Sequence, residues 1–293
     1  MLRLQGSIVA LVTPFNRDGS VDYARTGELV DWHIAHKTDG IVVLGTTGES
    51  STMTGEEADK VCKLVVERAA GRIPVIAGSG SNCTATMLQK SLRYQNLGVD
   101  GLLVIAPYYN KANEEGMYRH FATVADAVNL PCILYNVPGR TGCSISEKVV
   151  LRLYKHENIA AIKEASGNLS YASQIARYLS DDFRMFSGND DIIVPMMALG
   201  SSGVISVFAN IFPEVSHNIV ADFLNGDIES SRAAQLKYLE VINSLFIEVN
   251  PIPVKAAMNR MGLRAGSLRL PLYEMGEGAK ARLESALLEV GAL

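Results

Sequence analysis

The chain has 293 residues, of which 48% are hydrophobic and 20% are charged, and its formal net charge is −4. This composition is typical of a well-packed α/β protein, and the lack of a basic stretch argues against nucleic acid as a partner. No apolar run approaches the roughly 20 residues that cross a bilayer, and the first residues lack the layout of a signal peptide, so we expect a cytoplasmic protein without a membrane partner.

Short apolar runs recur along the first 210 residues, and their starts lie about 20 to 33 residues apart. That interval accommodates a strand and a returning helix. Eight such units favour a (β/α)8 TIM barrel over a doubly wound open sheet, because no glycine-rich fingerprint follows the first run. The expected strands are Ser7–Val12, Gly40–Leu44, Ile73–Ala77, Gly101–Ile105, Pro131–Tyr135, Ile159–Lys163, Phe183–Phe186 and Gly203–Val207.

The segments between these runs have the pattern of amphipathic helices. Thr54 is followed by acidic residues, which indicates an N-cap and the first turn of a helix. After residue 225 the strand pattern stops, so we expect a barrel over residues 1–225 and a small helical region over residues 226–293. The expected helices are Asp22–Lys37, Thr54–Ala70, Thr84–Leu97, Glu114–Val128, Ser146–Lys155, Tyr171–Leu179 and Asp190–Leu199, then Ile228–Phe246, Pro253–Met261 and Ala279–Val290.

One strand candidate, Ile159–Lys163, ends in a lysine. Alternation along the strand places Lys163 on the face of Ile159 and Ala161, while Glu164 points the other way and is a poor partner for its charge. Burial disfavours an ammonium and leaves a neutral amine, which is a nucleophile for carbonyl carbon. The alternative is a lysine that ends the strand and extends to water.

Other polar side chains follow the ends of the predicted strands, where chemistry gathers in barrels of this class. Thr46 and Thr47 follow the second strand, two tyrosines follow the fourth, and Tyr135 ends the fifth, before Arg140. The sequence shows no His or Asp/Glu cluster typical of a metal site, and the cysteines form no CxxC pair, so we expect free thiols. The cysteines are Cys62, Cys83, Cys132 and Cys143.

This set of side chains suits reactions of a keto acid. A lysine amine condenses with the ketone to give an imine, which acts as an electron sink. An arginine or a threonine hydroxyl can hold a carboxylate, and tyrosine and threonine hydroxyls can pass protons. The chemistry requires no metal and no organic cofactor.

Three motifs resemble a known family. Gly45–Ser50, Tyr135–Thr141 and Ile162–Glu164 are similar to those of the pyruvate-dependent class I aldolase family that contains dihydrodipicolinate synthase and N-acetylneuraminate lyase. The resemblance covers essentially the whole chain, and Gly139–Thr141 with Pro107–Lys111 resembles the synthase branch. That branch condenses pyruvate with L-aspartate-4-semialdehyde to 4-hydroxy-tetrahydrodipicolinate, in the biosynthesis of diaminopimelate and lysine.

The resemblance implies a role for each matching residue. Lys163 would form the Schiff base with pyruvate, Tyr135 would move protons, and Thr46 would link Tyr135 to Tyr109. In the family that last tyrosine comes from a neighbouring subunit, which implies a homo-oligomer, usually a tetramer built as a dimer of dimers. The residues expected to bind substrate are Thr47, Arg140, Gly188 and the main chain at Ile205.

A further match concerns feedback inhibition. Relatives that are inhibited by lysine bind it at a subunit interface, and Ser50, Asn82 and Tyr108 match part of that site. At the other positions this chain has Gly55, Ala58 and Thr86, so the carboxylate that would pair with the effector ammonium is absent. We therefore expect weak lysine inhibition or none. Ala112, where many relatives have proline, is expected to loosen the loop that carries Tyr109.

Three alternatives remain open at this point. A lyase or aldolase of a keto sugar acid would use the same Lys163 imine, but its polyol substrate would not need Arg140. A phosphosugar aldolase would use the loops at Ser187–Asp190 and Gly200–Gly203, where Asp190 and Asp191 have the wrong charge for a phosphate. A non-catalytic keto-acid-binding protein would need Arg140 and Thr47 but would gain nothing from Lys163.

Overall fold

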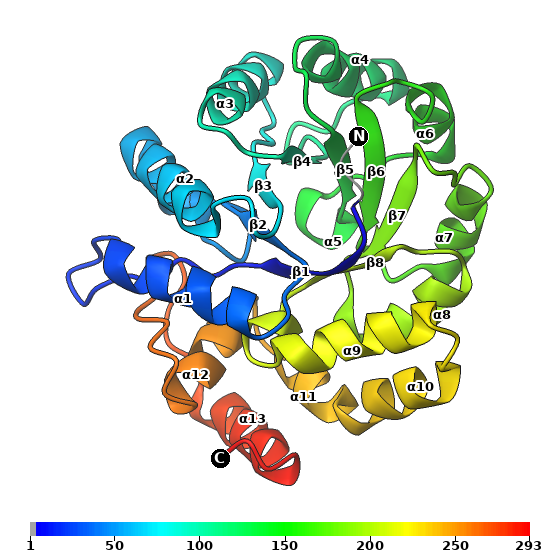
Figure 1. Ribbon diagram of the computed structural model, residues 1–293. Helices are drawn as coiled ribbons and strands as arrows, with labels where there is room; N and C mark the ends of the chain where they lie inside the picture. The colour runs from blue at the N-terminus through cyan, green and yellow to red at the C-terminus, as the bar shows by residue number, and fades with distance from the viewer. Residues whose placement is uncertain (1–3) are drawn as a thin grey trace.

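The structure is a computed structural model that describes residues 4–293, and within them eight parallel strands close into a barrel (Figure 1). Each strand pairs with the next along the chain, and the eighth pairs with the first. The predicted (β/α)8 fold is confirmed. The strands are β1 (Gly6–Ala10), β2 (Gly40–Val43), β3 (Val75–Gly78), β4 (Gly101–Ile105), β5 (Cys132–Asn136), β6 (Ile159–Glu164), β7 (Arg184–Ser187) and β8 (Gly203–Ser206).

Helices surround the barrel, and the best-marked helix start lies where the sequence predicts it. The Thr54 hydroxyl accepts a hydrogen bond from the Glu57 amide, and the Glu57 carboxylate accepts one from the Thr54 amide. This exchange satisfies two amides that a helix leaves without partners. The helices of the barrel are α1 (Tyr23–Ala35), α2 (Gly55–Ala69), α3 (Thr84–Asn96), α4 (Glu114–Ala125), α5 (Pro138–Thr141), α6 (Glu147–Leu153), α7 (Leu169–Ala176), α8 (Ile193–Ala198) and α9 (Pro213–Leu224), with short 3₁₀ helices η1 (Ser50–Thr52), η2 (Asp190–Ile192) and η3 (Phe208–Asn210).

Two elements around the last strands differ from the prediction. No helix is predicted after the eighth strand, yet α9 lies there. It begins with Pro213, and proline is tolerated at this position because the N–H of the first helical residue has no partner within the helix. The predicted helix over residues 190–199 is shorter, because its first residues form η2. Asp190 instead accepts hydrogen bonds from the amides of Val207 and Phe208, at 2.9 and 3.0 Å.

The C-terminal region consists of helices on one side of the barrel, yellow to red in Figure 1. The predicted helix over residues 228–246 is divided at Tyr238, whose ring packs 5.7 Å from Phe208 and 5.1 Å from Phe212 between centroids. Within residues 4–293, no strand follows β8, and no helix is long and apolar enough to cross a membrane. The helices are α10 (Ile228–Lys237), α11 (Leu239–Ser244), α12 (Ile252–Arg260) and α13 (Glu277–Glu289).

Alternate residues of the strands fill the inside of the barrel. Ile8, Ile133 and Phe186 are among the buried side chains of this interior cluster. Ala161 belongs to it as well, so the alternation along β6 directs Lys163 to the same face, two residues nearer the C-terminal ends of the strands. The four cysteines are free, as predicted.

Candidate active site

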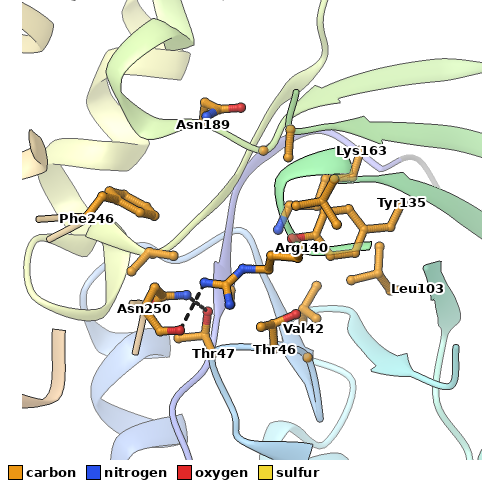
Figure 2. A pocket seen from close by; sticks show the side chains of 16 residues that line it. Val42, Thr46, Thr47, Leu103, Tyr135, Arg140, Lys163, Asn189, Phe246 and Asn250 are labelled. Atoms are coloured by element: carbon orange, nitrogen blue, oxygen red, sulfur yellow. Dashed lines mark hydrogen bonds between the residues drawn. The ribbon is translucent and has the colours of Figure 1, made fainter. Parts of the chain in front are cut away.

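The site is a cavity of about 170 Å³ at the C-terminal ends of the strands (Figure 2). Six of the residues singled out in the sequence line it together, although they come from the three segments that follow β2, β5 and β7 and from the strands β5 and β6. They are Thr46, Thr47, Tyr135, Arg140, Lys163 and Gly188. Asn189, Val207, Phe246 and Asn250 also line it and have no role in the prediction.

Lys163 is buried, with 5% of its surface exposed, and its Nζ lies 4.5 Å from the centre of the Tyr135 ring. Burial lowers the pKa of Lys163 to about 8, from 10.5. The Asp190 carboxylate opposes this shift in the pKa and the Arg140 guanidinium adds to it. A lysine at the end of a strand that extends to water would not lose its charge in this way. The amine of Lys163 is therefore partly neutral near neutral pH.

Gly188 lies close to both Ala165 and Lys163. A Cβ at position 188 would lie 2.4 Å from Cβ of Ala165 and 3.0 Å from Cε of Lys163. The clash with Ala165 is the severe one, because the end of the lysine side chain can move. The small residue is thus required by the close approach of the segment after β7 to the segment after β6.

Asp190 is the acidic group whose charge acts on Lys163, and the prediction gives it no such role. It is 1% exposed, and its Oδ2 holds the amides of Val207 and Phe208. Its Oδ1 has no hydrogen-bond partner within residues 4–293. Burial raises the pKa of Asp190 above its usual value. Its position just after β7, at the same rim as Lys163, is the signal that would have identified it.

Glu164 lies apart from Lys163, as the strand alternation predicts. Its carboxylate accepts hydrogen bonds from the Asn136 side chain at 2.7 Å and from the Ser166 amide at 2.6 Å. Burial raises the pKa of Glu164. This residue therefore supports the loop after β6.

Tyr135 and Thr46 form a hydroxyl pair beside the lysine. Tyr135 is 8% exposed, and burial raises the pKa of its phenol, although Arg140 and a hydrogen bond with Thr46 act in the opposite direction. The phenol is therefore protonated at neutral pH and can donate a proton. Thr46 can pass that proton onward, because a hydroxyl both donates and accepts.

The carboxylate-binding candidates Thr47 and Arg140 both contact Asn250, as the dashed lines in Figure 2 show. The Asn250 side-chain amide donates to Oγ1 of Thr47 at 2.9 Å, and the Asn250 main-chain carbonyl accepts from Arg140 Nη2 at 3.0 Å. Asn250 lies between α11 and α12. A residue of the C-terminal region thus joins two groups that the barrel supplies.

A buried ion pair holds the loop of Thr46 and Thr47 against the C-terminal region. Lys255 Nζ lies 2.6 Å from the Glu49 carboxylate, and their side chains are only 2% and 1% exposed. Glu49 also accepts from the Arg269 amide at 3.0 Å, and Lys255 donates to the Ser267 carbonyl at 2.7 Å. Burial lowers the pKa of Lys255 to about 8, against the pull of Glu49.

A second, smaller cavity adjoins the first, and Thr46 and Tyr135 line both of them. Tyr108 and Ser50 also line it. Tyr109 lies outside both cavities, with 89% of its surface exposed and a left-handed backbone, φ +71°. A non-glycine residue is held in that conformation at a cost, which is typical of functional loops. Tyr109 does not reach Thr46 within one chain.

The two remaining residues lie elsewhere. Ile205 is fully buried in the barrel interior and does not line the cavity. Asn82 does not line the second cavity with Ser50 and Tyr108, and its main-chain carbonyl accepts from Asn110 at 2.9 Å. The structure therefore brings together six residues of the predicted site; Asn82 lines neither cavity, and the role expected of Ile205 belongs to its main chain.

Proteins of known function are similar to this chain in sequence and in structure. The sequence profile of the Dihydrodipicolinate synthetase family matches residues 3–290. The chain is 51% identical over 291 residues to the 4-hydroxy-tetrahydrodipicolinate synthase of Caldicellulosiruptor bescii, covering 99% of this chain and 98% of that protein.

Solved structures give the same result. The dihydrodipicolinate synthase of Aquifex aeolicus superimposes with a TM-score of 0.96 and 43% identity, covering 99% of both chains. The chloride-inhibited dihydrodipicolinate synthase of Acinetobacter baumannii, solved in complex with pyruvate, has a TM-score of 0.96 and 42% identity, again over 99% of both chains.

Proposed function

The chain belongs to the dihydrodipicolinate synthetase family, and from this premise we propose that it condenses pyruvate with L-aspartate-4-semialdehyde to 4-hydroxy-tetrahydrodipicolinate, a lyase activity, through a Schiff base on Lys163. The observation that carries the proposal is a buried lysine with a lowered pKa beside Tyr135. The relative from Acinetobacter baumannii, with pyruvate in its structure, supports the choice of first substrate.

The first step is imine formation. The neutral amine of Lys163 attacks the ketone carbon of pyruvate, and the ketone oxygen takes up a proton to become a hydroxyl. The carbinolamine nitrogen loses a proton, and the hydroxyl takes up a second proton and leaves as water, which gives the protonated imine. Tyr135 donates and recovers these protons, because its phenol is protonated and Nζ of Lys163 lies over its ring.

The imine then makes the methyl group of pyruvate acidic. Loss of one methyl proton gives an enamine, whose carbon attacks the aldehyde carbon of the second substrate, and the aldehyde oxygen takes up a proton. The amino group of that substrate attacks the imine carbon, closes the ring and releases Lys163 as a free amine. Thr47 holds the pyruvate carboxylate and Arg140 the carboxylate of the semialdehyde, as hydroxyl and guanidinium groups commonly do.

Trapping the imine tests this proposal. Reduction with borohydride in the presence of pyruvate is expected to leave a stable adduct on the Lys163 peptide in a mass spectrum. A coupled assay with L-aspartate-4-semialdehyde then identifies the second substrate. An adduct without condensation, but with cleavage of a keto sugar acid, would assign the lyase activity instead, and absence of an adduct would leave only a keto-acid-binding protein.

The protein acts as a homo-oligomer in this proposal, because Tyr109 completes the proton relay from a second copy of the chain. The exposure of Tyr109, 89%, and the cavity beside Thr46 support such an exchange. We propose a tetramer made of two such dimers.

Tyr109→Phe is expected to lower kcat by roughly 10²-fold, the usual contribution of a proton-transfer group, while pyruvate is still trapped on Lys163. Steady-state kinetics and mass spectrometry measure the two effects. Tyr118→Phe, a tyrosine outside both cavities, serves as the control. An unchanged rate in Tyr109→Phe would remove this residue from the relay.

The pH dependence of trapping follows from the lowered pKa of Lys163. Only the neutral amine attacks, so the rate of adduct formation with cyanoborohydride at low pyruvate is expected to rise about tenfold per pH unit and to level off near pH 8. Asp190→Asn removes the anion that raises this pKa, so the midpoint moves to lower pH. Arg140→Met removes a cation and moves it to higher pH. A parent midpoint near 10.5 would contradict a buried amine.

Feedback inhibition by lysine is expected to be weak. Gly55, Ala58 and Thr86 provide no carboxylate for the effector ammonium, and the loss of one charged contact weakens binding by roughly 10- to 150-fold. Steady-state rates with millimolar L-lysine measure this, and Thr86→Glu is the matched variant that adds a carboxylate. Half-inhibition of the parent below millimolar lysine would contradict the expectation.

We propose a boundary near residue 225 between the barrel, residues 1–225, and the helical region, residues 226–293; residues 1–3 lie outside the described residues. Phe246 and Asn250 of the helical region line the cavity with Lys163. In this proposal the two parts form one catalytic unit.

A further inference from the structure

Asn250 makes two hydrogen bonds that take no part in the bond-making steps of the proposed reaction. It is 5% exposed, lines the cavity of Lys163, and touches the side chain of Thr47 and the guanidinium of Arg140 (Figure 2). These are the two groups expected to hold the carboxylates of the two substrates. One residue is therefore in contact with both carboxylate-binding groups.

The direction of the bond between Asn250 and Thr47 decides what Thr47 can do. A threonine hydroxyl has a single hydrogen but can accept through its lone pairs. Because Nδ2 of Asn250 donates to Oγ1, the hydroxyl hydrogen of Thr47 is not used in this contact. Within residues 4–293 the Thr47 hydroxyl has no other side-chain or main-chain hydrogen bond, so its hydrogen is available to a ligand in the cavity.

The opposite arrangement would prevent this. If the Thr47 hydroxyl donated to the side-chain oxygen Oδ1 of Asn250, Thr47 would present only lone pairs to the cavity and would repel a carboxylate. In the structure, Oδ1 of Asn250 is buried without a hydrogen-bond partner in the described chain, and the NH₂ group faces Thr47. A carboxylate ligand binds to the arrangement in which Thr47 donates.

The contact with Arg140 works through the main chain. The Asn250 carbonyl accepts from Nη2 at 3.0 Å, which leaves the other N–H groups of the guanidinium for a second carboxylate. Replacing the side chain of Asn250 keeps this carbonyl. The two functions of the residue can therefore be separated by mutation.

The buried pair of Glu49 and Lys255 keeps Asn250 opposite Thr47. Glu49 lies two residues after Thr47, and Lys255 lies five residues after Asn250, in α12. Their contact of 2.6 Å joins the two segments that carry the hydrogen bond. The amide and the hydroxyl thus face each other before any ligand binds.

We propose that Asn250 is a positioning residue that makes Thr47 a dedicated hydrogen-bond donor to the carboxylate of the 2-oxo acid and that anchors Arg140 for the carboxylate of the aldehyde. The identity of the substrates rests on the function proposed above. Selection of a 2-oxo acid over a simple ketone then depends on a residue that does not touch the reacting carbon.

Competition between a ketone with a carboxylate and one without it tests this role. Pyruvate and acetone both form an imine with a lysine, but only pyruvate has the carboxylate. Asn250→Ala is expected to raise the pyruvate concentration for half-maximal trapping by about 3- to 10-fold, the effect of one hydrogen bond, with acetone trapping unchanged within twofold. In the coupled assay the KM for pyruvate rises by the same factor, and kcat at saturation changes less.

Two further variants show whether Asn250 acts through Thr47. In a Thr47→Val background, Asn250→Ala is expected to change the pyruvate concentration for half-maximal trapping by less than twofold, because the hydroxyl that Asn250 orients is absent. Asn250→Asp can only accept from the hydroxyl, so it is expected to weaken pyruvate trapping by roughly 10- to 100-fold, more than alanine does. Val207→Ala changes the cavity away from this contact. It is expected to change the concentrations of pyruvate and acetone for half-maximal trapping by the same factor.

The outcomes separate the two proposals. If the parent protein does not trap pyruvate, the proposed function fails. If the parent traps pyruvate but Asn250→Ala weakens the trapping of pyruvate and of acetone equally, the function stands and the role of Asn250 is overturned. The same conclusion follows if the fold-changes of the Asn250 and Thr47 variants multiply in the double variant.

Discussion

Lys163→Ala is expected to lower turnover to below about one thousandth of the parent value and to abolish the borohydride adduct. An amine held beside the ketone acts at an effective molarity of ~10⁵ M or more, which no amine in solution replaces. The cavity keeps Thr47 and Arg140, so pyruvate still binds without reacting. Coupled kinetics and mass spectrometry with pyruvate measure the two losses.

Lys163→Arg is the control that retains a positive charge at this position. A guanidinium keeps its proton at all relevant pH values, so this variant retains a cation and a long side chain but cannot form an imine. It is expected to be as inactive as the alanine variant. Lys148→Ala, with its side chain 81% exposed, is expected to behave like the parent. Turnover in Lys163→Arg above one tenth of the parent rate would refute covalent catalysis.

Lys255→Met is expected to lower the free energy of unfolding by about 3–5 kcal/mol. The substitution keeps the length of the side chain but leaves the Glu49 carboxylate buried without its cation, at 1% exposure. The cost of an unpaired buried charge, rather than lost attraction, explains the size of the effect. Urea unfolding at a fixed protein concentration measures it, because oligomers unfold in a concentration-dependent way.

The double variant Glu49→Gln/Lys255→Met removes the unpaired buried charge. It is expected to recover at least half of the free energy of unfolding that Lys255→Met loses. Glutamine still accepts from the Arg269 amide, which Glu49 holds at 3.0 Å. The KM for pyruvate is expected to rise in Lys255→Met and to move back toward the parent value in the double variant, because the same pair keeps Thr47 opposite Asn250. Losses that simply add in the double variant would show that the two residues do not act as a pair.

The barrel could be predicted because each β/α unit carries its own pattern. The strand bounds agree with the apolar runs to within two residues, since a strand buried on both faces has a continuous apolar sequence. The helix boundaries that were wrong depend on distant contacts. α11 begins at Leu239, directly after Tyr238, whose ring packs on Phe208 and Phe212.

The rim residues could also be predicted, because strand ends in a barrel meet at one edge. Lys163, Tyr135 and Thr46 lie together as expected. The side chain of Ile205 lies in the interior with Ile8, as its alternation within β8 directs, and the role expected of this residue belongs to its main chain.

By itself the sequence determined the barrel, because strand and helix patterns alternate along the chain. It also determined the face on which Lys163 lies and the ring of hydroxyl and guanidinium groups, because these follow from the alternation along a strand and from the ends of the strands. Only the tertiary structure decided that the charge of Asp190 acts on the Lys163 amine, that Glu49 pairs with Lys255, and that Asn250 binds Thr47. The last two residues are 203 positions apart along the chain, and no local pattern relates them. Their contact exists because barrel closure and the packing of the C-terminal helices bring both segments to one rim.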